Sequence, residues 1–500
     1  MTINITLTDG TVKNYSEPVD GFEIASDISR GLLKDSVCIE VNNKFYDLSY
    51  KFTTDAKVRI VTVKDLDALH ILRHSAAHIL AQAVLNLYPG TTYGVGPSIE
   101  NGFYYDFKFI DPISEVELEN VEKEMLRIAQ SKQEFIRKTL SKEEAKKIFN
   151  KHPFKLELID SAESSEGVEN DIVSTYSNDS FIDLCMGPHV PNTNFLKHFK
   201  LTKLGGAYWR GDENNPQLQR IYGTAWFSKD DFDKYVIQQE EAEKRDHRKI
   251  GNELNLFTSA TELGSGNFLW KPKGAILRDL IESYSKKAHL NNGYNLVNTP
   301  HIGRSILWET SGHLKHYKEN MYPPLEHFEN NETYYLKPMN CPFHILVYKS
   351  DIHSYRELPL RYFEFGSVYR YEKTGVLHGL LRLRGFTQDD AHIFCSNDQI
   401  NEEVKTLLKF SIQLLKSFGL TDIEADLSTR PKKYIGNESD WNVATESLKN
   451  SLTELEIPFI TAEGEGAFYG PKIDLHAKDA IGRRWQLSTI QIDFAQPDNF

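Results

Sequence analysis

Apolar and polar residues alternate in short stretches through the first sixty or so residues of the chain. Residues 3–7 form one such stretch, which ends at Asp9-Gly10, a dipeptide typical of hairpin turns. A second pair of strands is predicted around Asn42-Asn43 and a further strand at residues 58–63, with one short helix over residues 23–33. This pattern predicts a small β-grasp-like module.

From Asp67 the spacing of apolar residues changes to that of a helix. The sequence LHILRHSAAHILAQAVLNLY predicts a long helix that ends at Pro89-Gly90, and a second helix is expected over residues 115–133. Residues 161–178 are polar and rich in Gly, Ser and Glu, so we expect a surface loop there.

A highly charged stretch, KDDFDKYVIQQEEAEKRDHRKIG, follows Ser228, a suitable helix N-cap. Long polar helices of this kind typically connect domains, so we place a domain boundary there. The remainder mixes helices such as GAILRDLIESYSKK with aromatic strands such as LRYFEFGSVYRYE, which predicts a mixed α+β domain around an antiparallel sheet. No G-x-G-x-x-G or G-x-x-x-x-G-K-S/T motif stands at a strand–helix junction, which argues against Rossmann and P-loop nucleotide binding.

Composition narrows the class of protein. The 500 residues suffice for about three or four domains, and the 40% hydrophobic content excludes a collagen-like or wholly disordered chain. The net charge of −13 argues against binding nucleic acid over the whole surface by charge alone, although a local basic groove stays compatible with it. Four scattered cysteines, no secretory leader and no bilayer-length apolar run lead us to expect a cytoplasmic protein.

Two pairs of chemically capable residues lie in the first half of the chain. His74 and His78 are four residues apart on the predicted helix, so their rings lie on one face, and DLCMGPHV supplies Cys185 and His189 at the same spacing. Three imidazoles and a thiol are zinc-ligand types, so the pairs predict either a metal site or a hydrolytic site. The alternative is two unrelated surface pairs.

The stretch LRYFEFGSVYRYEKTGVLHGLLRLRGFTQDDAHIF predicts two strands joined by a Gly-containing turn. Clustered guanidinium groups on a rigid hairpin suit bidentate phosphate binding, a phenyl ring can stack on a nucleobase, and amide or carboxylate groups can bind a polar substrate or Mg²⁺. The alternative is a surface hairpin laced with ion pairs. The residues concerned are Arg370, Glu372, Arg382, Arg384, Phe386, Gln388, Asp389 and Asp390.

Two further signals flank this hairpin. Cys341 lies between two prolines in LKPMNCPFH, and with His392 it offers two of the three protein ligands of a catalytic zinc, unless it is simply a buried apolar cysteine. Downstream, EGEGAFYGPKIDLH is rich in glycine and carries Tyr469 and Lys472. Glycines allow close approach to a ligand, but they equally form ordinary turns.

These motifs together resemble the bacterial-type threonyl-tRNA synthetases, which are class II aminoacyl-tRNA synthetases. The similarity extends from the first strand to Phe500, through strings that include RHSAAHIL, GPSIENGFYYDF, DLCMGPHVPNT, LKPMNCPFH, LHGLLRLRGFTQDDAHIFC and EGEGAFYGPKIDLH. Several of these strings are too long to agree by chance, and on them the chain is identified as a member of that family.

The resemblance implies an α+β multidomain protein. Its parts would be a β-grasp-like TGS module, an α/β editing domain, a linker helix and a class II catalytic core with an antiparallel sheet, at residues 1–63, 64–226, 227–250 and 251–500. Motif 1 of the class would comprise the helix from Ala275 and the strand that ends at Pro300, and it would form a homodimer interface.

The resemblance also implies roles for individual residues. Arg370 would hold the α-phosphate of ATP, Glu372 the adenine end and Arg382 the β- and γ-phosphates, while Phe386 would stack on adenine. Cys341 and His392 would bind one Zn²⁺, and Mg²⁺ would accompany ATP. The threonine and adenylate pocket would be formed by Asp390, Tyr469, Gln486 and Gln491. Lys472 would lie beside this pocket, and His313 would act in the transfer to tRNA.

The activity implied is formation of threonyl-adenylate from L-threonine and ATP, transfer to tRNA(Thr), and hydrolysis of seryl-tRNA(Thr) at a second site. A zinc that ligates the amino and hydroxyl groups of threonine would reject valine by about 10⁴–10⁵, whereas serine lacks only a methyl group worth ~1–3 kcal/mol and needs correction. The editing residues would be His74, His78, Cys185 and His189, with Lys155 and Asp183 as helpers. They would position an ester and a water, so zinc at this cluster is the second interpretation.

The family pattern continues beyond IQIDFAQPDNF to a third zinc-binding histidine, motif 3 and an anticodon-binding domain, so we expect a C-terminally truncated chain. Two other hypotheses follow from this. Under one, the chain is a stand-alone hydrolase that acts on seryl-tRNA; under the other, it is a non-enzymatic RNA-binding regulator that uses the TGS-like and editing modules.

Overall fold

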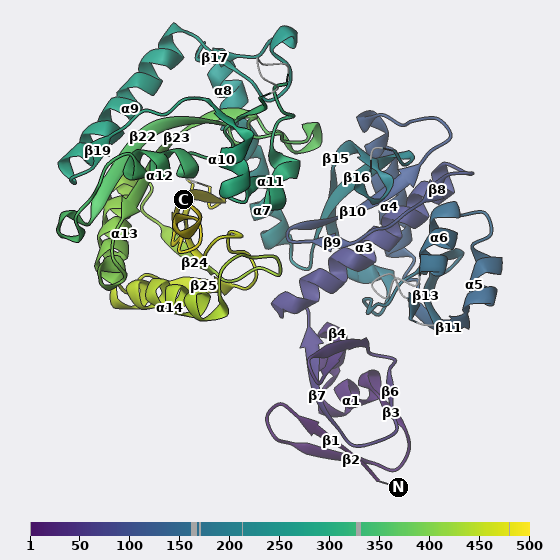
Figure 1. Ribbon diagram of the computed structural model, residues 1–500. Helices are drawn as coiled ribbons and strands as arrows, with labels where there is room; N and C mark the ends of the chain where they lie inside the picture. Colours follow the sequence, from purple (N-terminus) through teal and green to yellow (C-terminus); the bar gives the residue numbers. More distant parts are fainter. Residues whose placement is uncertain (1, 162–167, 170–171, 213, 327–331, 480) are drawn as a thin grey trace. The chain divides into compact units, whose positions relative to one another are not determined.

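A computed structural model describes residues 2–161, 168–169, 172–212, 214–326, 332–479 and 481–500 (Figure 1). It consists of two compact units, Met1–Ile237 and Gln238–Phe500. Across the described ranges, no helix combines the length and the apolar character needed to cross a membrane.

The chain begins with a small module built on a five-stranded sheet of order β2-β1-β7-β4-β5, in which β1 and β7 are parallel. The predicted turns are present: Gly10 has a φ of 85°, and Asn42 and Asn43 have φ values of 50° and 61°, which a tight two-residue hairpin requires. The elements of this N-terminal module are β1 (Ile3–Leu7), β2 (Val12–Tyr15), β3 (Val19–Asp20), α1 (Gly21–Ile28), α2 (Arg30–Asp35), β4 (Ser36–Val41), β5 (Lys44–Asp47), β6 (Lys51–Phe52) and β7 (Ala56–Thr62).

The single helix expected over residues 23–33 is in fact two. Ser29 has extended backbone angles, φ −168° and ψ 152°, and separates α1 from α2. Its hydroxyl accepts a hydrogen bond from the Leu32 amide at 3.0 Å, so it caps the second helix. The helical spacing of apolar residues continues across this break, so periodicity alone does not reveal it.

The next part is organised around α3 (Leu66–Leu87), the long helix predicted from Asp67. It packs against β10 and β16 of a sheet of order β15-β16-β10-β8, and a second sheet has the order β11-β13-β12 with β14 paired to β13. The remaining elements here are β8 (Thr92–Tyr93), β9 (Ser98–Ile99), β10 (Gly102–Lys108), α4 (Leu118–Gln130), β11 (Ile136–Ser141), α5 (Lys142–Ile148), α6 (Pro153–Ser161), β12 (Val168–Glu169), β13 (Ile172–Asn178), β14 (Phe181–Leu184), β15 (His198–Tyr208) and β16 (Gln217–Trp226).

The structure describes only part of the segment 161–178, where a loop was expected. Residues 162–167 and 170–171 lie outside the described residues, but β13 occupies the end of this stretch, where a loop was predicted. Its polar composition concealed a central strand, because Ser174 and Thr175 are buried between the neighbouring strands β11 and β14.

The N-terminal module and α3 share one hydrophobic core. Val37, Cys38 and Val61 of the module are fully buried in the same cluster as Leu72 and Ala76 of α3. The module is therefore packed onto the helix that carries His74 and His78, and does not hang from it on a flexible linker.

The predicted connector helix is divided. Its first part is α7 (Lys229–Lys244), where the Ser228 hydroxyl accepts from the Asp231 amide at 3.1 Å as an N-cap. The second part is α8 (His247–Glu253), which starts afresh because the Asp246 side chain accepts from the Arg248 amide at 2.8 Å. A good internal N-cap thus ends the continuous helix expected over residues 227–250.

The C-terminal unit mixes helices with a three-stranded sheet of order β19-β22-β23, a four-stranded sheet of order β25-β24-β26-β27, and the two-stranded sheets β17-β18 and β20-β21. The pairs β22–β23, β24–β26 and β26–β27 are antiparallel, whereas β19–β22 and β24–β25 are parallel. Its elements are α8, β17 (Phe257–Thr258), β18 (Leu269–Trp270), α9 (Pro272–Asn291), β19 (Asn295–Leu296), β20 (Ile302–Arg304), α10 (Ser305–Thr310), α11 (His313–His316), β21 (Tyr334–Leu336), α12 (Cys341–Lys349), β22 (Leu360–Tyr369), β23 (Gly385–Phe394), α13 (Ile400–Ser417), β24 (Ile423–Ser428), α14 (Glu438–Glu454), β25 (Phe459–Ala462), β26 (Lys472–Lys478) and β27 (Arg484–Gln491). The predicted α+β multidomain fold is confirmed.

Candidate functional site

The structure brings the two His/Cys pairs of the N-terminal unit together. His74 and His78 lie one turn apart on α3, with ring centroids 5.1 Å from each other. Cys185 and His189 belong to the 185–189 loop, which follows β14 and contains the cis bond Gly187–Pro188. One ligand atom from each of the four residues lies within 4.8 Å of all the others.

Cys185 lies at the centre of this cluster. Its Sγ is 2.8 Å from His74 Nε2 and 3.4 Å from His189 Nε2, and it accepts a hydrogen bond from the Gly187 amide at 3.1 Å. The thiol therefore links the helix to the 185–189 loop.

The tautomer of His189 follows from its neighbour Ser75. The Ser75 hydroxyl donates to the Ile71 carbonyl at 2.9 Å, so its oxygen must accept from His189 Nδ1, which lies 3.0 Å away. His189 then carries its proton on Nδ1, and its Nε2 lone pair faces Cys185. Such a nitrogen can accept a proton from water or bind a metal.

A buried ion pair supports the cluster from behind. Lys155 Nζ lies 2.6 Å from Asp183 Oδ1, and His78 Nε2 lies 3.7 Å from Asp183 Oδ2. The Tyr105 hydroxyl donates to the same carboxylate and accepts from Lys155. Both helpers named from the sequence thus lie beside His78, and the side chains of Lys155, Asp183, Tyr105 and His78 are all buried.

Burial holds the imidazoles neutral. It lowers the pKa of His74 from 6.5 to about 4, and it lowers the pKa values of His78 and His189 well below 6.5, with the neighbouring histidines adding to the effect. Neutral imidazoles are the form that binds metals and the form that takes up a proton, so the chemistry of a metal site and that of a hydrolytic site both remain open to this cluster.

The cluster opens into a cavity of about 470 Å³. His74, His78, Lys155, Asp183 and Cys185 line it, together with Phe45 of the N-terminal module. A cavity of this size is large enough for an aminoacyl ester.

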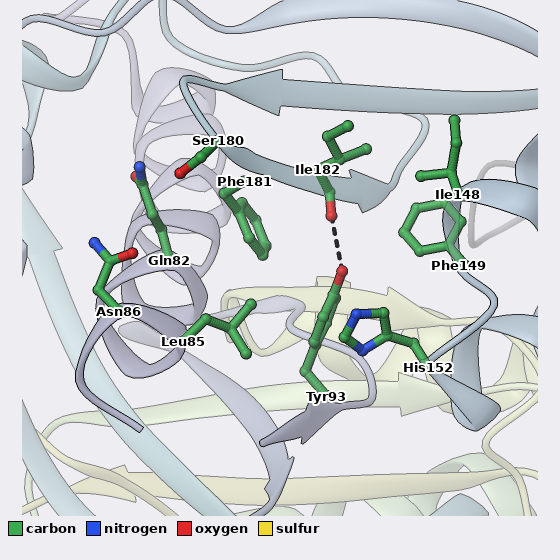
Figure 2. Close-up of a pocket in the computed structure, with 10 residues that line it drawn as sticks. All are labelled: Gln82, Leu85, Asn86, Tyr93, Ile148, Phe149, His152, Ser180, Phe181 and Ile182. Atoms are coloured by element: carbon green, nitrogen blue, oxygen red, sulfur yellow. Dashed lines mark hydrogen bonds between the residues drawn. The ribbon is translucent and has the colours of Figure 1, made fainter. Parts of the chain in front are cut away.

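A smaller cavity of about 220 Å³ lies elsewhere in the same unit, around Tyr93, whose hydroxyl donates to the Ile182 carbonyl at 2.8 Å (Figure 2). His152 and Gln82 are among its lining residues. No residue predicted for catalysis lines it, so we assign the chemistry to the larger cavity.

The arginine hairpin of the C-terminal unit is formed by β22 and β23. The Arg370 guanidinium lies 5.2 Å from the centre of the Phe386 ring, and Glu372 accepts hydrogen bonds from Arg382 at 3.0 and 3.1 Å. The predicted residues are thus gathered at one end of the hairpin. Arg384 is used differently, because it donates to the backbone carbonyl oxygen of Glu372 at 2.9 Å.

The two aspartates of the hairpin are separated by the alternation of β23. Asp390 accepts from the Asn340 side chain at 2.8 Å, whereas Asp389 accepts from Ser285 of α9 at 3.1 Å. The two carboxylates therefore do not form a joint Mg²⁺ site, which the sequence left open. Gln388 lies on β23 opposite Gly366.

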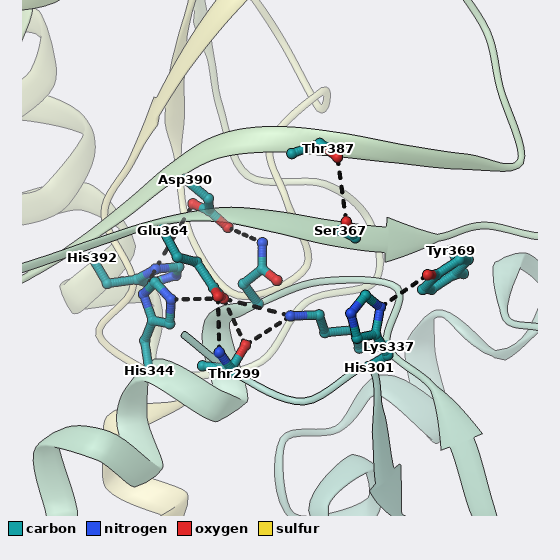
Figure 3. Close-up of polar contacts among 11 residues, drawn as sticks. Thr299, His301, Lys337, His344, Glu364, Ser367, Tyr369, Thr387, Asp390 and His392 are labelled. Carbon is teal, nitrogen blue, oxygen red and sulfur yellow. Dashed lines mark hydrogen bonds and ion pairs between the residues drawn. The ribbon is translucent and has the colours of Figure 1, made fainter. Parts of the chain in front are cut away.

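A buried polar network surrounds His392 (Figure 3). His392 Nδ1 lies 2.8 Å from His344 Nδ1, and His344 Nε2 lies 3.1 Å from Glu364 Oε1. Thr299 donates to Glu364 through its amide and its hydroxyl, at 3.0 and 2.6 Å, and Lys337 Nζ lies 3.5 Å from the same carboxylate.

This network fixes the tautomer of His392. Burial favours a raised pKa for Glu364, but hydrogen bonds from His344 and Thr299 and the Lys337 charge outweigh it and lower the pKa to about 2. The carboxylate can only accept, so His344 donates through Nε2 and its Nδ1 accepts from His392. His392, whose pKa burial lowers to about 4, thus keeps the lone pair on Nε2, the nitrogen that a metal would bind.

Cys341 is the first residue of α12, on the same helix as His344. Burial raises the pKa of its thiol well above the usual value, and the carboxylates of Asp390 and Asp493 add to this. Tyr469, which is 4% exposed, responds to the same neighbours, because burial first and then Cys341 and Asp493 raise its pKa. The mutual effects on these pKa values indicate that Cys341, Asp390 and Tyr469 lie near one another.

The remaining predicted residues lie on β26 and β27, or, for Tyr469, just before β26. The Tyr469 hydroxyl donates to Gln491 Oε1 at 2.5 Å. Lys472 Nζ lies 2.7 Å from Asp474 Oδ2, and Gln486 donates to the other oxygen of Asp474, also at 2.7 Å. Asp474 was not singled out from the sequence, although it holds both side chains.

His313 is fully buried, at the start of α11. Its Nδ1 lies 2.8 Å from the Ser311 hydroxyl, its Nε2 has no partner among the described residues, and burial lowers its pKa to about 4. The ring meets the edge of Phe468, the residue before Tyr469. His313 is thus a neutral imidazole beside the predicted pocket.

The sequence did not single out the other residues of the polar network around His392. His344 had a usable signal, since it follows Cys341 by three residues on one predicted helix. Glu364, Lys337 and Thr299 had none, because three separate segments bring them together.

Three domain families match the chain. They are the TGS domain over residues 3–62, the Threonyl and Alanyl tRNA synthetase second additional domain over residues 173–222, and the tRNA synthetase class II core domain (G, H, P, S and T) over residues 325–500.

Curated relatives match the chain along nearly all of its length. A threonine–tRNA ligase of Nitrosococcus oceani is 47% identical over 498 residues, which are 99% of this chain and 76% of the relative. Those of Citrifermentans bemidjiense and Thermotoga petrophila are 45% and 47% identical, and each match covers 100% of this chain and 77% of the relative.

Proposed function

The chain belongs to the threonyl-tRNA synthetase family of aminoacyl-tRNA ligases, and on that premise we propose that it forms threonyl-adenylate from L-threonine and ATP. Mg²⁺ accompanies ATP, and the threonyl group passes to tRNA(Thr). A second site, in the editing domain, hydrolyses seryl-tRNA(Thr). The observation that carries this proposal is the presence of two separate clusters, the polar network around His392 and the His/Cys cluster around Cys185, in one chain of this family.

The β22–β23 hairpin supports the ATP site. The Phe386 ring and the Arg370 guanidinium lie close enough for a purine and a phosphate to be held side by side. Arg382 is half exposed at 53%, so it keeps N–H donors for phosphate oxygens while Glu372 orients it. The roles are Arg370 on the α-phosphate, Arg382 on the outer phosphates, Glu372 toward adenine and Phe386 stacked on it.

The threonine pocket comprises Asp390, Tyr469, Gln486, Gln491 and Lys472, with His313 beside it for transfer to tRNA. Asp474 would fix Lys472 and Gln486, and the contact between Tyr469 and Gln491 would fix those two side chains.

Cys341 and His392 are the proposed ligands of one Zn²⁺. A thiol and an imidazole with its Nε2 lone pair preserved are donors that zinc favours, so these residues fit the ion. Bound there, zinc would supply Lewis-acid ligation of the amino and hydroxyl groups of threonine. His344 and Glu364 would orient the His392 ring.

Editing is proposed to use the neutral imidazoles around Cys185. The Nε2 lone pair of His189 can take a proton from the attacking water, and the carboxylate of Asp183, paired with Lys155, keeps His78 oriented. Metal-assisted hydrolysis at the same four residues is the second candidate, because their ligand atoms lie within 4.8 Å of one another.

A homodimer through motif 1 is part of the proposal. Helix α9 exposes Ile276, Leu277, Leu280, Ile281 and Tyr284, each more than 40% accessible. An apolar row on one side of a helix favours a protein partner, and a second copy of the chain fits the class.

Threonine-dependent exchange of pyrophosphate into ATP tests the synthetic half. We expect exchange by the enzyme, and its loss in Arg370→Ala and Cys341→Ser. Exchange that continues unchanged in Cys341→Ser would overturn the zinc assignment. If the chain hydrolyses seryl-tRNA but exchanges no pyrophosphate, the editing hydrolase is its only activity.

A further inference from the structure

Asp47, the last residue of β5, reaches from the N-terminal module to the 185–189 loop. Its Oδ1 accepts a hydrogen bond from the His189 amide at 2.9 Å. Its Oδ2 accepts from the Tyr176 hydroxyl at 2.5 Å. Both oxygens of one carboxylate are thus used by residues of the editing domain.

The donors of these two bonds are themselves packed on the site. The Tyr176 ring lies 4.5 Å from the His189 ring, edge to face, and both residues are 1% exposed. A Cβ atom at Gly187 would lie 1.9 Å from the Tyr176 hydroxyl, so the 185–189 loop passes directly over it. Asp47 therefore restrains the loop at its end, through His189, and near its middle, through Tyr176.

The part of the N-terminal module that carries Asp47 is itself well packed. Cys38 pairs with Asp47 across β4 and β5 and is fully buried in the core that the module shares with α3. Phe45 of β5 also lines the 470 Å³ cavity. Burial raises the pKa of Asp47, because an ionised carboxylate costs free energy at this buried position. The hydrogen bonds from the Tyr176 hydroxyl and the His189 amide offset this cost.

We propose that Asp47 is a positioning residue for editing: the N-terminal module holds the 185–189 loop, and with it Cys185 and His189, in register with His74 and His78. The inference rests on the proposed hydrolysis of seryl-tRNA. It gives the TGS module a part in that reaction without contact with the substrate, because Asp47 itself does not line the cavity.

The test compares Asp47→Ala with Asp55→Ala in the 500-residue chain. Asp55 is the matched control, because it accepts from the Asn4 amide at 2.8 Å and from the Asn4 side chain at 3.0 Å, one backbone and one side-chain donor within the same module. Steady-state hydrolysis of seryl-tRNA(Thr) gives kcat and KM, and amide hydrogen exchange reports on the segment 185–190.

We expect the kcat of Asp47→Ala to fall about 10- to 100-fold, since displacement of reacting groups by an ångström costs rates of this order. KM should stay within about twofold, because the cavity wall is intact, and exchange in segment 185–190 should rise. Asp55→Ala should match the unmodified chain in all three. Asp47→Asn keeps one acceptor oxygen and should recover part of the kcat, and Tyr176→Phe should give a smaller loss.

The outcomes separate this inference from the proposed function. If the unmodified chain leaves seryl-tRNA intact, the proposed function is wrong. If it hydrolyses seryl-tRNA and Asp47→Ala does so at the same kcat, only the role of Asp47 is wrong. Should Asp47→Ala unfold, full kcat in both Asp47→Asn and Tyr176→Phe, with unchanged exchange in segment 185–190, would overturn it.

Discussion

Lys155 and Asp183 form an ion pair in the interior of the editing domain, with side chains 1% and 3% exposed. Removal of one partner leaves a buried charge without compensation, which typically costs about 3–5 kcal/mol. We expect Lys155→Met to lower the free energy of unfolding of the N-terminal unit by about that amount, as measured by urea denaturation. The double variant Lys155→Met/Asp183→Asn should be less destabilised, and a double variant as unstable as the single one would contradict the pairing.

The buried histidines make stability depend on pH. His74 has a pKa of about 4 in the folded chain and 6.5 as its ordinary value, so the unfolded state binds more protons between these pH values. Stability from this group is complete above pH 6.5 and is lost as pH falls toward 4. Between pH 7 and pH 5 we expect His74 to account for about 2 kcal/mol of lost stability. Denaturation of His74→Gln should show a correspondingly weaker pH dependence, and an equal dependence would refute the assignment.

At the scale of elements, the sequence was most informative where one helix or one hairpin carried the signal. The i, i+4 spacing of His74 and His78 and the arginines of the β22–β23 hairpin needed only local geometry. The breaks at Ser29 and Asp246 were missed because a cap competes locally with a periodicity that runs on through it. Contacts such as Asp47 with Tyr176 depend on tertiary packing, which no local pattern encodes.

Helix α9 provides the prediction for an element. Leu280, which is 61% exposed, lies in its apolar row, so Leu280→Asp should convert a dimer into a monomer in light scattering. Lys286→Asp, an exposed residue of the same helix about 120° around its axis from Leu280, is the control and should leave the mass unchanged. A dimer that persists in Leu280→Asp would show that α9 is not the interface.

At the scale of the whole molecule, the net charge of −13 bears on how tRNA is bound. An acidic chain that binds tRNA needs local basic clusters, and we expect Arg370, Arg382 and Arg384 at the end of the β22–β23 hairpin to form one of them. The resemblance over the full length supplied the domain order, whereas hydrophobic patterning alone indicated helices and strands but missed the breaks at Ser29 and Asp246 and the strand β13. Patterning could not have joined the module to α3, because the shared core forms only in the folded unit.

The zinc content of cysteine variants shows which of two candidate sites binds the metal, the Cys341/His392 pair or the cluster around Cys185. We expect one zinc per chain by elemental analysis, lost in Cys341→Ala and retained in Cys185→Ala. The two variants are matched, because each removes one thiol by the same substitution. Zinc lost in Cys185→Ala but retained in Cys341→Ala would instead place the metal in the editing domain.

The central claim is that this chain removes serine from tRNA(Thr) at the Cys185 cluster, and the hydrolysis rate of seryl-tRNA(Thr) tests it most directly. We predict hydrolysis at least about tenfold faster than that of threonyl-tRNA(Thr), because one extra methyl group is worth ~1–3 kcal/mol in a fitted cavity. The double variant Cys185→Ala/His189→Ala should be slower by about 10²-fold or more. Seryl-tRNA that stays intact with the unmodified chain, or is cleaved equally fast by the double variant, would contradict the claim.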